Sequence, residues 1–126
     1  MAAPVRILAF AGSAREGSYN HRLLLLGAEG ARQAGAEVTV VRLGDFPMPL
    51  YHAELEAREG LPQSVKQFKR LMLEHDGFLI GCPEYNSSIT PLLKNVIDWA
   101  SRAEEGEPPL ACYRGKVAAL LSASPG

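Results

Sequence analysis

Four short apolar runs recur along the chain, and each is separated from the next by a stretch with helical spacing. The runs cover residues 5–11, 37–43, 78–82 and 116–121. Strands that are apolar on both faces and alternate with helices are typical of a parallel sheet covered on each side. With right-handed crossovers, this order predicts an α/β fold built on a doubly wound parallel sheet.

The segments between the runs divide into helices and loops. Apolar spacing predicts helices over 23–34, 61–75 and 91–103. Residues 44–60 are predicted to be a loop, because prolines and a glycine interrupt any regular element there. Ligands of doubly wound sheets bind at the carboxyl ends of the strands. The loops to inspect are therefore 12–20, 83–90 and 122–126.

Length, charge and cysteine content narrow the class of protein. The 126 residues fit one domain, 1–126, that can bury its own core. The net charge of −1 gives no support for nucleic acid as a partner, and no apolar stretch approaches the roughly 20 residues of a membrane span. Cys82 and Cys112 form no Cys-x-x-Cys pair, and no histidine lies at metal-ligand spacing from them. We therefore expect reduced thiols, no metal site and a cytoplasmic location.

The first loop carries groups that suit an anion. Ser13, Arg15, Ser18 and Asn20 precede or open a predicted helix, and the N-terminus of a helix favours negative charge. A phosphate monoester would suit these donors, with Arg15 supplying charge-assisted hydrogen bonds. The alternative is an ordinary helix start with serine and asparagine caps.

The second loop mixes an aromatic ring with hydrogen-bonding groups. It contains Pro83, Glu84, Tyr85, Asn86 and Ser87. A flat heteroaromatic ligand with polar edges needs an apolar surface beside its face and donors at its rim. The alternative is a surface turn that leads into a capped helix.

Three motifs together resemble the NAD(P)H-dependent FMN reductases, which include quinone-, azo- and chromate-reducing flavoenzymes. The motifs are G-S-A-R-E-G-S-Y-N at 12–20, P-E-Y-N-S at 83–87 and L-K-N-V-I-D-W-A-S-R at 93–102. The resemblance implies a flavodoxin-like three-layer α/β/α fold with strand order 2-1-3-4 and FMN as cofactor. It also implies that the helix with Lys94, Asn95, Asp98 and Trp99 often lies at a dimer interface; the alternative is a core helix with a buried tryptophan.

The resemblance also assigns site residues. The first motif would hold the FMN phosphate and the second would border the isoalloxazine ring, whereas Tyr19 occupies a position that varies in the family. Ser124 would touch the flavin from the loop after the fourth strand. The expected cofactor-binding residues are Ser13, Arg15, Ser18, Tyr19, Asn20, Pro83, Glu84, Tyr85, Asn86, Ser87 and Ser124.

The sequence departs from the family pattern at its end. Relatives continue after the fourth strand with a glycine-rich loop, a helix, a fifth strand and a final helix, and the fifth strand is missing from this chain. We expect a bare sheet edge at 116–121, which invites pairing with another chain. A fragment, a truncated gene product and an assembly that replaces the missing layer would each explain it.

The resemblance implies an enzyme that transfers hydride from NADPH or NADH to FMN and then to a small acceptor: a quinone, an azo compound, chromate or free flavin. No side chain need be catalytic, because the flavin carries the chemistry. The alternatives are a non-catalytic flavin-binding or electron-carrier module and an inactive truncated remnant. A carrier is expected to be strongly acidic, so the near-neutral charge and Arg15 favour the enzyme. We expect a homodimer or homotetramer.

Overall fold

The computed structural model describes residues 2–124, and its centre is a four-stranded parallel sheet. The strands are β1 (Arg6–Ala11), β2 (Glu37–Val40), β3 (Gly77–Gly81) and β6 (Val117–Leu121), in the order β2-β1-β3-β6. Since β6 is the fourth strand predicted from the sequence, the predicted order 2-1-3-4 is confirmed.

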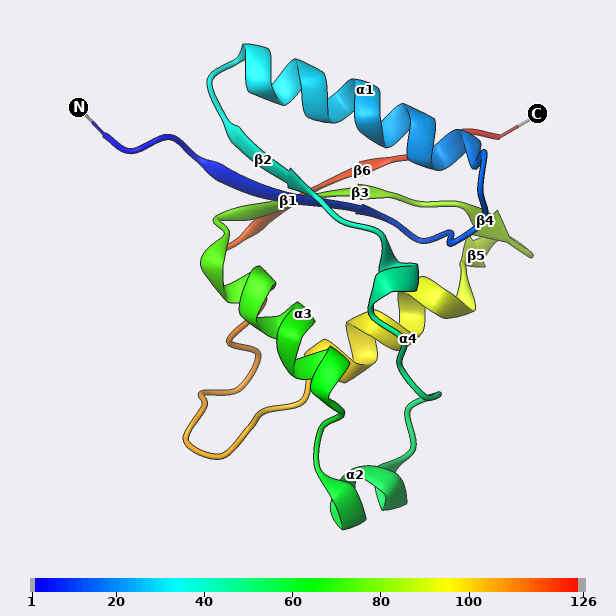
Figure 1. Ribbon diagram of the computed structural model, residues 1–126, viewed down its shortest axis with the longest axis vertical. Coiled ribbons are helices and arrows are strands. Elements are labelled where there is room, and N and C mark those ends of the chain that lie inside the picture. Colours follow the sequence, from blue (N-terminus) through cyan, green and yellow to red (C-terminus); the bar gives the residue numbers. More distant parts are fainter. Residues whose placement is uncertain (1, 125–126) are drawn as a thin grey trace.

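Helices cover both faces of the sheet, as a doubly wound fold requires. Figure 1 shows α1 (Tyr19–Gln33) on one face, and α3 (Gln63–Glu74) and α4 (Pro91–Ala100) on the other. The prediction placed the start of the first helix at residue 23. The helix begins earlier because Ser18 caps it, its hydroxyl oxygen accepting a hydrogen bond from the backbone N–H of His21 at 3.4 Å.

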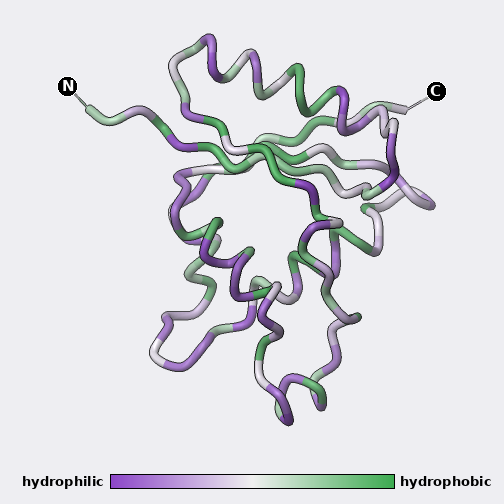
Figure 2. The backbone as a smooth tube through the Cα atoms, viewed as in Figure 1, coloured by the Kyte–Doolittle hydropathy of each residue, from purple (hydrophilic) through white to green (hydrophobic). Residues whose placement is uncertain are grey.

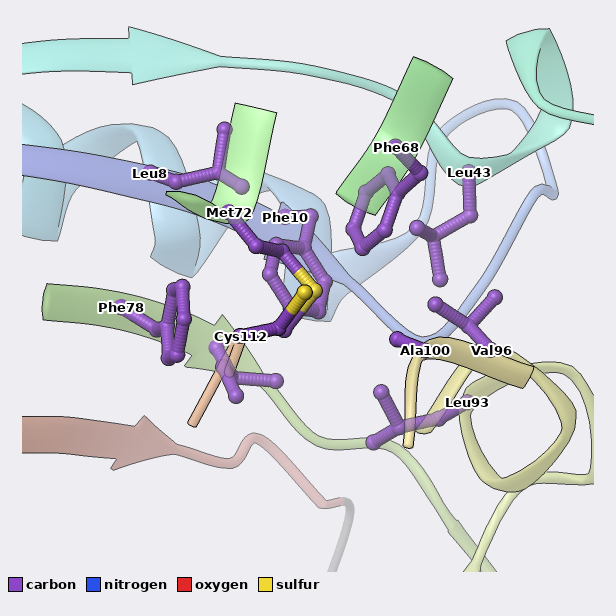
Figure 3. Packing of buried hydrophobic residues seen from close by; sticks show 11 residues of the cluster. Leu8, Phe10, Leu43, Phe68, Met72, Phe78, Leu93, Val96, Ala100 and Cys112 are labelled. Carbon is purple, nitrogen blue, oxygen red and sulfur yellow. The ribbon is translucent and has the colours of Figure 1, made fainter. Parts of the chain in front are cut away.

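The alternation of side chains along β1 divides the interior into two cores. Leu8 and Phe10 point towards α3 and α4, where the ring of Phe10 packs edge-on against Phe68 with centroids 5.2 Å apart (Figure 3). Ala9 and Ala11 point to the opposite face and pack under α1. Figure 2 shows the hydrophobic strands gathered at the centre of the molecule, between these helical layers.

The predicted loop 44–60 is wrong in part. A 3-10 turn, η1 (Leu43–Asp45), follows a β2 strand that ends at Val40 instead of at residue 43, and a short helix, α2 (Ala53–Glu59), lies further on. The helix α2 has no buried residue, so its sequence has no apolar stripe to indicate it. Its cap is His52, whose Nδ1 accepts a hydrogen bond from the N–H of Leu55 at 3.4 Å.

A second difference lies in the predicted loop 83–90. It contains an antiparallel hairpin made of β4 (Glu84–Tyr85) and β5 (Ser88–Ile89). Strands of two residues are too short to leave a periodic pattern in the sequence.

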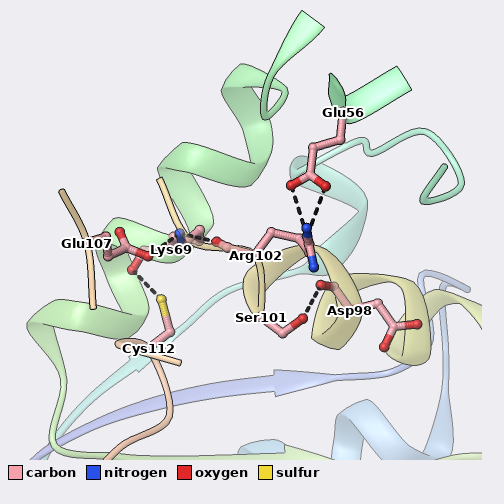
Figure 4. A network of polar contacts seen from close by, with 7 residues as sticks. All are labelled: Glu56, Lys69, Asp98, Ser101, Arg102, Glu107 and Cys112. Atoms are coloured by element: carbon pink, nitrogen blue, oxygen red, sulfur yellow. Dashed lines mark hydrogen bonds and ion pairs between the residues drawn. The ribbon is translucent and has the colours of Figure 1, made fainter. Parts of the chain in front are cut away.

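Polar contacts fasten the outer segments to the helical layer (Figure 4). Arg102 Nε donates to both carboxylate oxygens of Glu56 at 2.9 and 3.0 Å, which ties α2 to the end of α4. Lys69 on α3 is 1% exposed and donates to Glu107 Oε1 at 2.5 Å and to the carbonyl oxygen of Arg102 at 2.6 Å. The segment between α4 and β6 is thereby held against α3.

The edge formed by β6 is open within the part of the chain that the structure describes. There, β6 pairs with β3 alone, and Val117 and Leu120 are 78% and 66% exposed. On its inner side Leu121 approaches α1 closely, because a Cβ placed on Gly27 would lie 2.8 Å from Leu121 Cδ1. Among residues 2–124, no helix is long and apolar enough to cross a membrane.

Candidate functional site

Three loops from the carboxyl ends of the strands meet at one end of the sheet. Figure 1 shows the first turn of α1, the β4–β5 hairpin and the end of β6 together there. They enclose a cavity of about 190 Å³, which is lined by Ser13, Arg15, Ser18, Tyr19, Asn20, Pro83, Glu84, Tyr85, Ala123 and Ser124. A neighbouring cavity of about 480 Å³ is also lined by Arg15, Tyr19, Ala123 and Ser124.

Hydrogen bonds beyond the strands hold these loops in place. The N–H of Gly12 donates to the carbonyl oxygen of Gly81 at 2.8 Å, and the N–H of Cys82 donates to that of Leu121 at 2.7 Å. Thr90, which is buried and caps α4, donates from its hydroxyl to the carbonyl oxygen of Gly12 at 2.6 Å. The first loop is therefore anchored both to the sheet and to the start of α4.

Glycine is required at position 12 because α4 approaches so closely. A Cβ there would lie 2.9 Å from the Cβ of Leu93 and 3.1 Å from Thr90 Oγ1. The backbone of the first loop can therefore lie directly against the first turn of α4, which keeps the first loop beside the hairpin that precedes this helix.

One end of the cavity is built to attract an anion. The first turn of a helix leaves N–H groups without intrahelical acceptors, and those of Tyr19 and Asn20 find no acceptor among residues 2–124. Arg15 is exposed beside them, with no hydrogen-bond or ion-pair partner for its guanidinium in the described chain. Ser13 accepts from the N–H of Arg15 at 3.3 Å, which shapes the loop. The positive charge and the helix dipole reinforce each other here.

A nearby histidine adds no charge to this end. Burial, and then the positive charge of Arg42, lower the pKa of His21. Its imidazole is therefore neutral at pH 7, and Arg15 is the side chain that brings a full positive charge to the cavity lining.

The other end of the cavity is formed by the β4–β5 hairpin. Pro83, Glu84 and Tyr85 line it, and Tyr85 is 56% exposed. The two turn residues, Asn86 and Ser87, have φ angles of 54° and 66°, as in a type I′ hairpin turn. The hairpin and the first loop thus line the same cavity, and the hairpin contributes the aromatic residue Tyr85 to it.

A third cavity shares the lining residues Pro83 and Glu84 with the first. It measures about 400 Å³, and Cys82, Ser87 and Leu120 are among its lining residues. Burial raises the pKa of the Cys82 thiol, which keeps it protonated at neutral pH. Cys112 is buried elsewhere in the larger core, and neither cysteine forms a disulfide.

Most of the predicted site residues line the cavity of about 190 Å³ described first, which we call the main cavity. Its lining includes Ser13, Arg15, Ser18, Tyr19, Asn20, Pro83, Glu84, Tyr85 and Ser124. Ser87 lines the third cavity instead, and Asn86 lines none of the cavities described above. Ala123 was missed, because a methyl side chain carries no chemical signal in a sequence. No group of three His, Cys, Asp or Glu side chains in residues 2–124 could hold a metal ion.

Fold and site together define a class. A parallel sheet of order β2-β1-β3-β6, covered by helices on both faces and with its loops meeting around a cavity at its carboxyl end, is a flavodoxin-like α/β fold. The chain belongs to the NADPH-dependent FMN reductase family, whose model matches residues 5–126.

Individual relatives agree with this family. The chain is 38% identical over 124 residues to an NAD(P)H:quinone oxidoreductase of Solanum tuberosum, covering 97% of this chain and 60% of the relative. It is 37% identical over 126 residues to an NAD(P)H-dependent FMN reductase of Pseudomonas aeruginosa, covering 100% of this chain and 63% of the relative. The solved structure of FerB, a flavoenzyme NAD(P)H:acceptor oxidoreductase of Paracoccus denitrificans, matches with a TM-score of 0.75 and 32% identity.

The match to FerB covers 97% of this chain and 62% of that protein. The chain therefore spans about three fifths of the length of these relatives.

Proposed function

We propose that this protein binds FMN in the main cavity and uses it to transfer hydride from NAD(P)H to a small acceptor such as a quinone, an azo compound, chromate or free flavin. The observation that carries the proposal is the meeting of an anion-binding helix start and an aromatic hairpin across one cavity. FMN has a dianionic phosphate at one end and a flat ring system at the other, and it therefore matches both.

The phosphate end fits the donors of the first loop. Arg15 supplies a charge, Ser13 and Ser18 supply hydroxyl groups, and the N–H groups of Tyr19 and Asn20 lie at the positive end of α1. Ser18 keeps its capping bond to His21 and still lines the cavity, so capping and ligand binding are compatible.

The ring end fits the hairpin. Pro83 and Tyr85 offer apolar surface beside a flat ligand, and backbone N–H groups of this segment can donate to its rim. Ser124 and Ala123 close the cavity from the side of β6. FMN, once bound, would supply the redox chemistry, accepting a hydride and passing electrons on. The chain's own residues would bind and orient it, and none need act as nucleophile or general base.

Two further expectations belong to the same proposal. We infer a cytoplasmic location, supported by two unpaired cysteines, which suit a reducing compartment. We also infer a homodimer or homotetramer, supported by the exposed apolar side chains of Val117 and Leu120 on the open edge of the sheet.

The test has two stages. Titrating FMN with the protein should quench the flavin fluorescence and saturate, and protein with FMN should then oxidise NADPH when a quinone is added. An absence of quenching at high protein concentration would contradict FMN binding. Quenching without NADPH oxidation, with either NADPH or NADH and with several acceptors, would favour an electron carrier over an enzyme.

A further inference from the structure

We propose that Asn20 is a positioning residue: its amide clamps the segment after β6 onto the start of α1 and so builds one wall of the flavin site. The inference rests on the proposed function, but the clamp itself is a contact between parts of this chain. It gives Asn20 a role different from that of a direct phosphate ligand.

The clamp consists of two hydrogen bonds to one residue. Asn20 Nδ2 donates to the carbonyl oxygen of Ala123 at 3.2 Å, and the N–H of Ala123 donates to Asn20 Oδ1 at 3.0 Å. The two residues lie 103 positions apart in the sequence, and Asn20 is only 8% exposed. The side chain therefore pairs with the backbone of Ala123 in the way that a neighbouring strand would.

The position of the clamp explains why a side chain is needed there. The bond from the N–H of Cys82 to the carbonyl oxygen of Leu121 is the last backbone contact between β3 and β6. Beyond Leu121 the chain leaves the sheet and no longer pairs with β3. The side-chain amide of Asn20 then makes the hydrogen bonds to Ala123 that a neighbouring strand would make. An asparagine suits this task because its amide carries a donor and an acceptor side by side, as a peptide group does.

The first turn of α1 is a firm support for the clamp. It packs on the end of β3 so closely that a Cβ placed on Gly81 would lie 3.0 Å from the carbonyl oxygen of Asn20. A segment bonded to Asn20 is therefore fixed relative to the sheet as well as to the helix.

The clamped segment contributes to the site. Ala123 and Ser124 line the main cavity opposite Pro83 and Tyr85, and they also line the neighbouring cavity with Arg15. The two bonds between Ala123 and Asn20 join this wall to α1. We therefore expect loss of the clamp to weaken binding of the whole flavin, including its ring, and not of its phosphate alone.

The experiment compares FMN with riboflavin, which lacks the phosphate. Asn20→Ala should raise the dissociation constants of both ligands about tenfold, as expected for the loss of two hydrogen bonds that order one wall. If Asn20 were a direct phosphate ligand, the FMN constant would rise and the riboflavin constant would stay the same, and that result would overturn the proposal.

A matched control comes from α4. The side chain of Asn95 also makes two hydrogen bonds to backbone groups, accepting from the N–H of Tyr51 at 2.8 Å and donating to the carbonyl oxygen of Pro49 at 3.0 Å. It lines neither the main cavity nor the neighbouring cavity of about 480 Å³. Asn95→Ala should leave both dissociation constants within about twofold, since the loss of two such bonds elsewhere affects stability and not the wall. If Asn20→Ala and Asn95→Ala weakened FMN and riboflavin binding equally, general destabilisation would explain the result, and the proposal would be overturned.

A readout without ligand separates the clamp from the proposed function. In Asn20→Ala the amide hydrogen of Ala123 should exchange with solvent faster, while amides in the centre of β1 and β3 keep their protection. Unchanged exchange at Ala123 would overturn the clamp even if FMN binds. If the wild-type chain binds no FMN, while Asn20→Ala shows the faster exchange at Ala123, the proposed function is refuted and the clamp is supported.

The variant Asn20→Asp provides a rescue test. A protonated carboxyl group has a donor and an acceptor and can restore both bonds, whereas the ionised form has no donor for the carbonyl oxygen of Ala123. Riboflavin affinity of this variant, relative to wild type, should therefore recover as the pH falls below the carboxyl pKa. A ratio that does not change with pH would contradict the clamp.

Discussion

Under the proposed function, Arg15 is the residue on which we expect FMN affinity to depend most directly. Its guanidinium is exposed at the anion end of the cavity, with no partner inside residues 2–124. Arg15→Ala should weaken FMN binding by roughly 1.5–3 kcal/mol, because a charged hydrogen bond to the phosphate is lost. Fluorescence titration measures this change, and riboflavin should bind equally well to both proteins.

The control for this prediction removes the same charge nearby. Arg22 lies on α1 with its guanidinium 5.7 Å from the centre of the Tyr19 ring, and it does not line the cavity. Arg22→Ala should change FMN binding by less than about 0.5 kcal/mol, as expected for an exposed charge without direct contact. Equal losses in the two variants would mean that only the total charge matters, contrary to the assigned role of Arg15.

Ser87 is a residue with a strained backbone. Its φ of 66° is a conformation that glycine adopts more easily than serine. Ser87→Gly should stabilise the fold by roughly 0.5–1 kcal/mol, measured by urea unfolding. Ser88→Gly is the comparison, because Ser88 lies in β5 without positive φ and glycine should destabilise it slightly. Stabilisation by both variants, or by neither, would contradict strain at Ser87.

At the scale of elements, α1 offers two glycines with different surroundings. A Cβ on Gly30 would meet nothing within 4 Å, so Gly30→Ala should stabilise the fold by about 0.5–1 kcal/mol through helix propensity. A Cβ on Gly27 would lie 2.8 Å from Leu121 Cδ1 and 3.2 Å from Leu79 Cδ2. Overpacking there should cancel the gain or exceed it. Thermal unfolding of the two variants tests this, and equal stabilisation would show that α1 can move away from the sheet freely.

The contact between α2 and α4 should depend on pH. The hydrogen bond from Arg102, with a smaller contribution from the Tyr51 hydroxyl, lowers the pKa of Glu56 in the folded protein. A lowered pKa means that the pair stabilises the fold above the ordinary glutamate pKa of about 4.3 and loses this effect as pH falls through the folded value.

Glu56→Gln should therefore reduce the free energy of unfolding by about 1 kcal/mol at neutral pH and by little in acid. Urea unfolding across this pH range measures the difference from wild type. Glu59→Gln is the control on the same helix, since the exposed Glu59 carboxylate has, among residues 2–124, an ion pair only with Arg58 at 3.9 Å. A difference that stays constant with pH would mean that the ion pair does not contribute.

The elements that the sequence predicted correctly are those with a strong apolar period. The strands β1 and β3 and the helices α1, α3 and α4 each have buried residues, and their packing decides their structure. The outer strands β2 and β6 have none, and only their runs of apolar residues indicate them in the sequence. The helix α2 buries nothing, and β4 and β5 are too short to show alternation. Their formation depends on contacts such as Glu56 with Arg102, which no local pattern contains.

At the scale of the whole molecule, the convergence of the site follows from topology. Parallel strands end at the same edge of a sheet, so the loops after β1, β3 and β6 had to meet once the strand order was known. The contact between Asn20 and Ala123 could not be predicted in this way. It joins a side chain to a backbone 103 residues away, and it depends on how far the chain turns after Leu121.

The stability of this arrangement depends on the larger core, where Phe10 lies between Phe68 and Phe78 at centroid distances of 5.2 and 6.4 Å. Phe10→Ala should cost about 3–5 kcal/mol, since it removes a fully buried ring and leaves a cavity. That is a large share of the roughly 5–15 kcal/mol that stabilises a typical domain. Chemical unfolding of the variant measures the loss.

The comparison is Val117→Ala on β6, at the open edge of the same sheet, where the side chain is 78% exposed and the change should stay within about 0.5 kcal/mol. Because a ligand that binds only the folded chain adds to its stability, saturating FMN should raise the unfolding midpoint of Phe10→Ala and of wild type alike. A Phe10→Ala chain that loses less than about 1 kcal/mol would show that the core on this face does not hold the sheet and its three loops together.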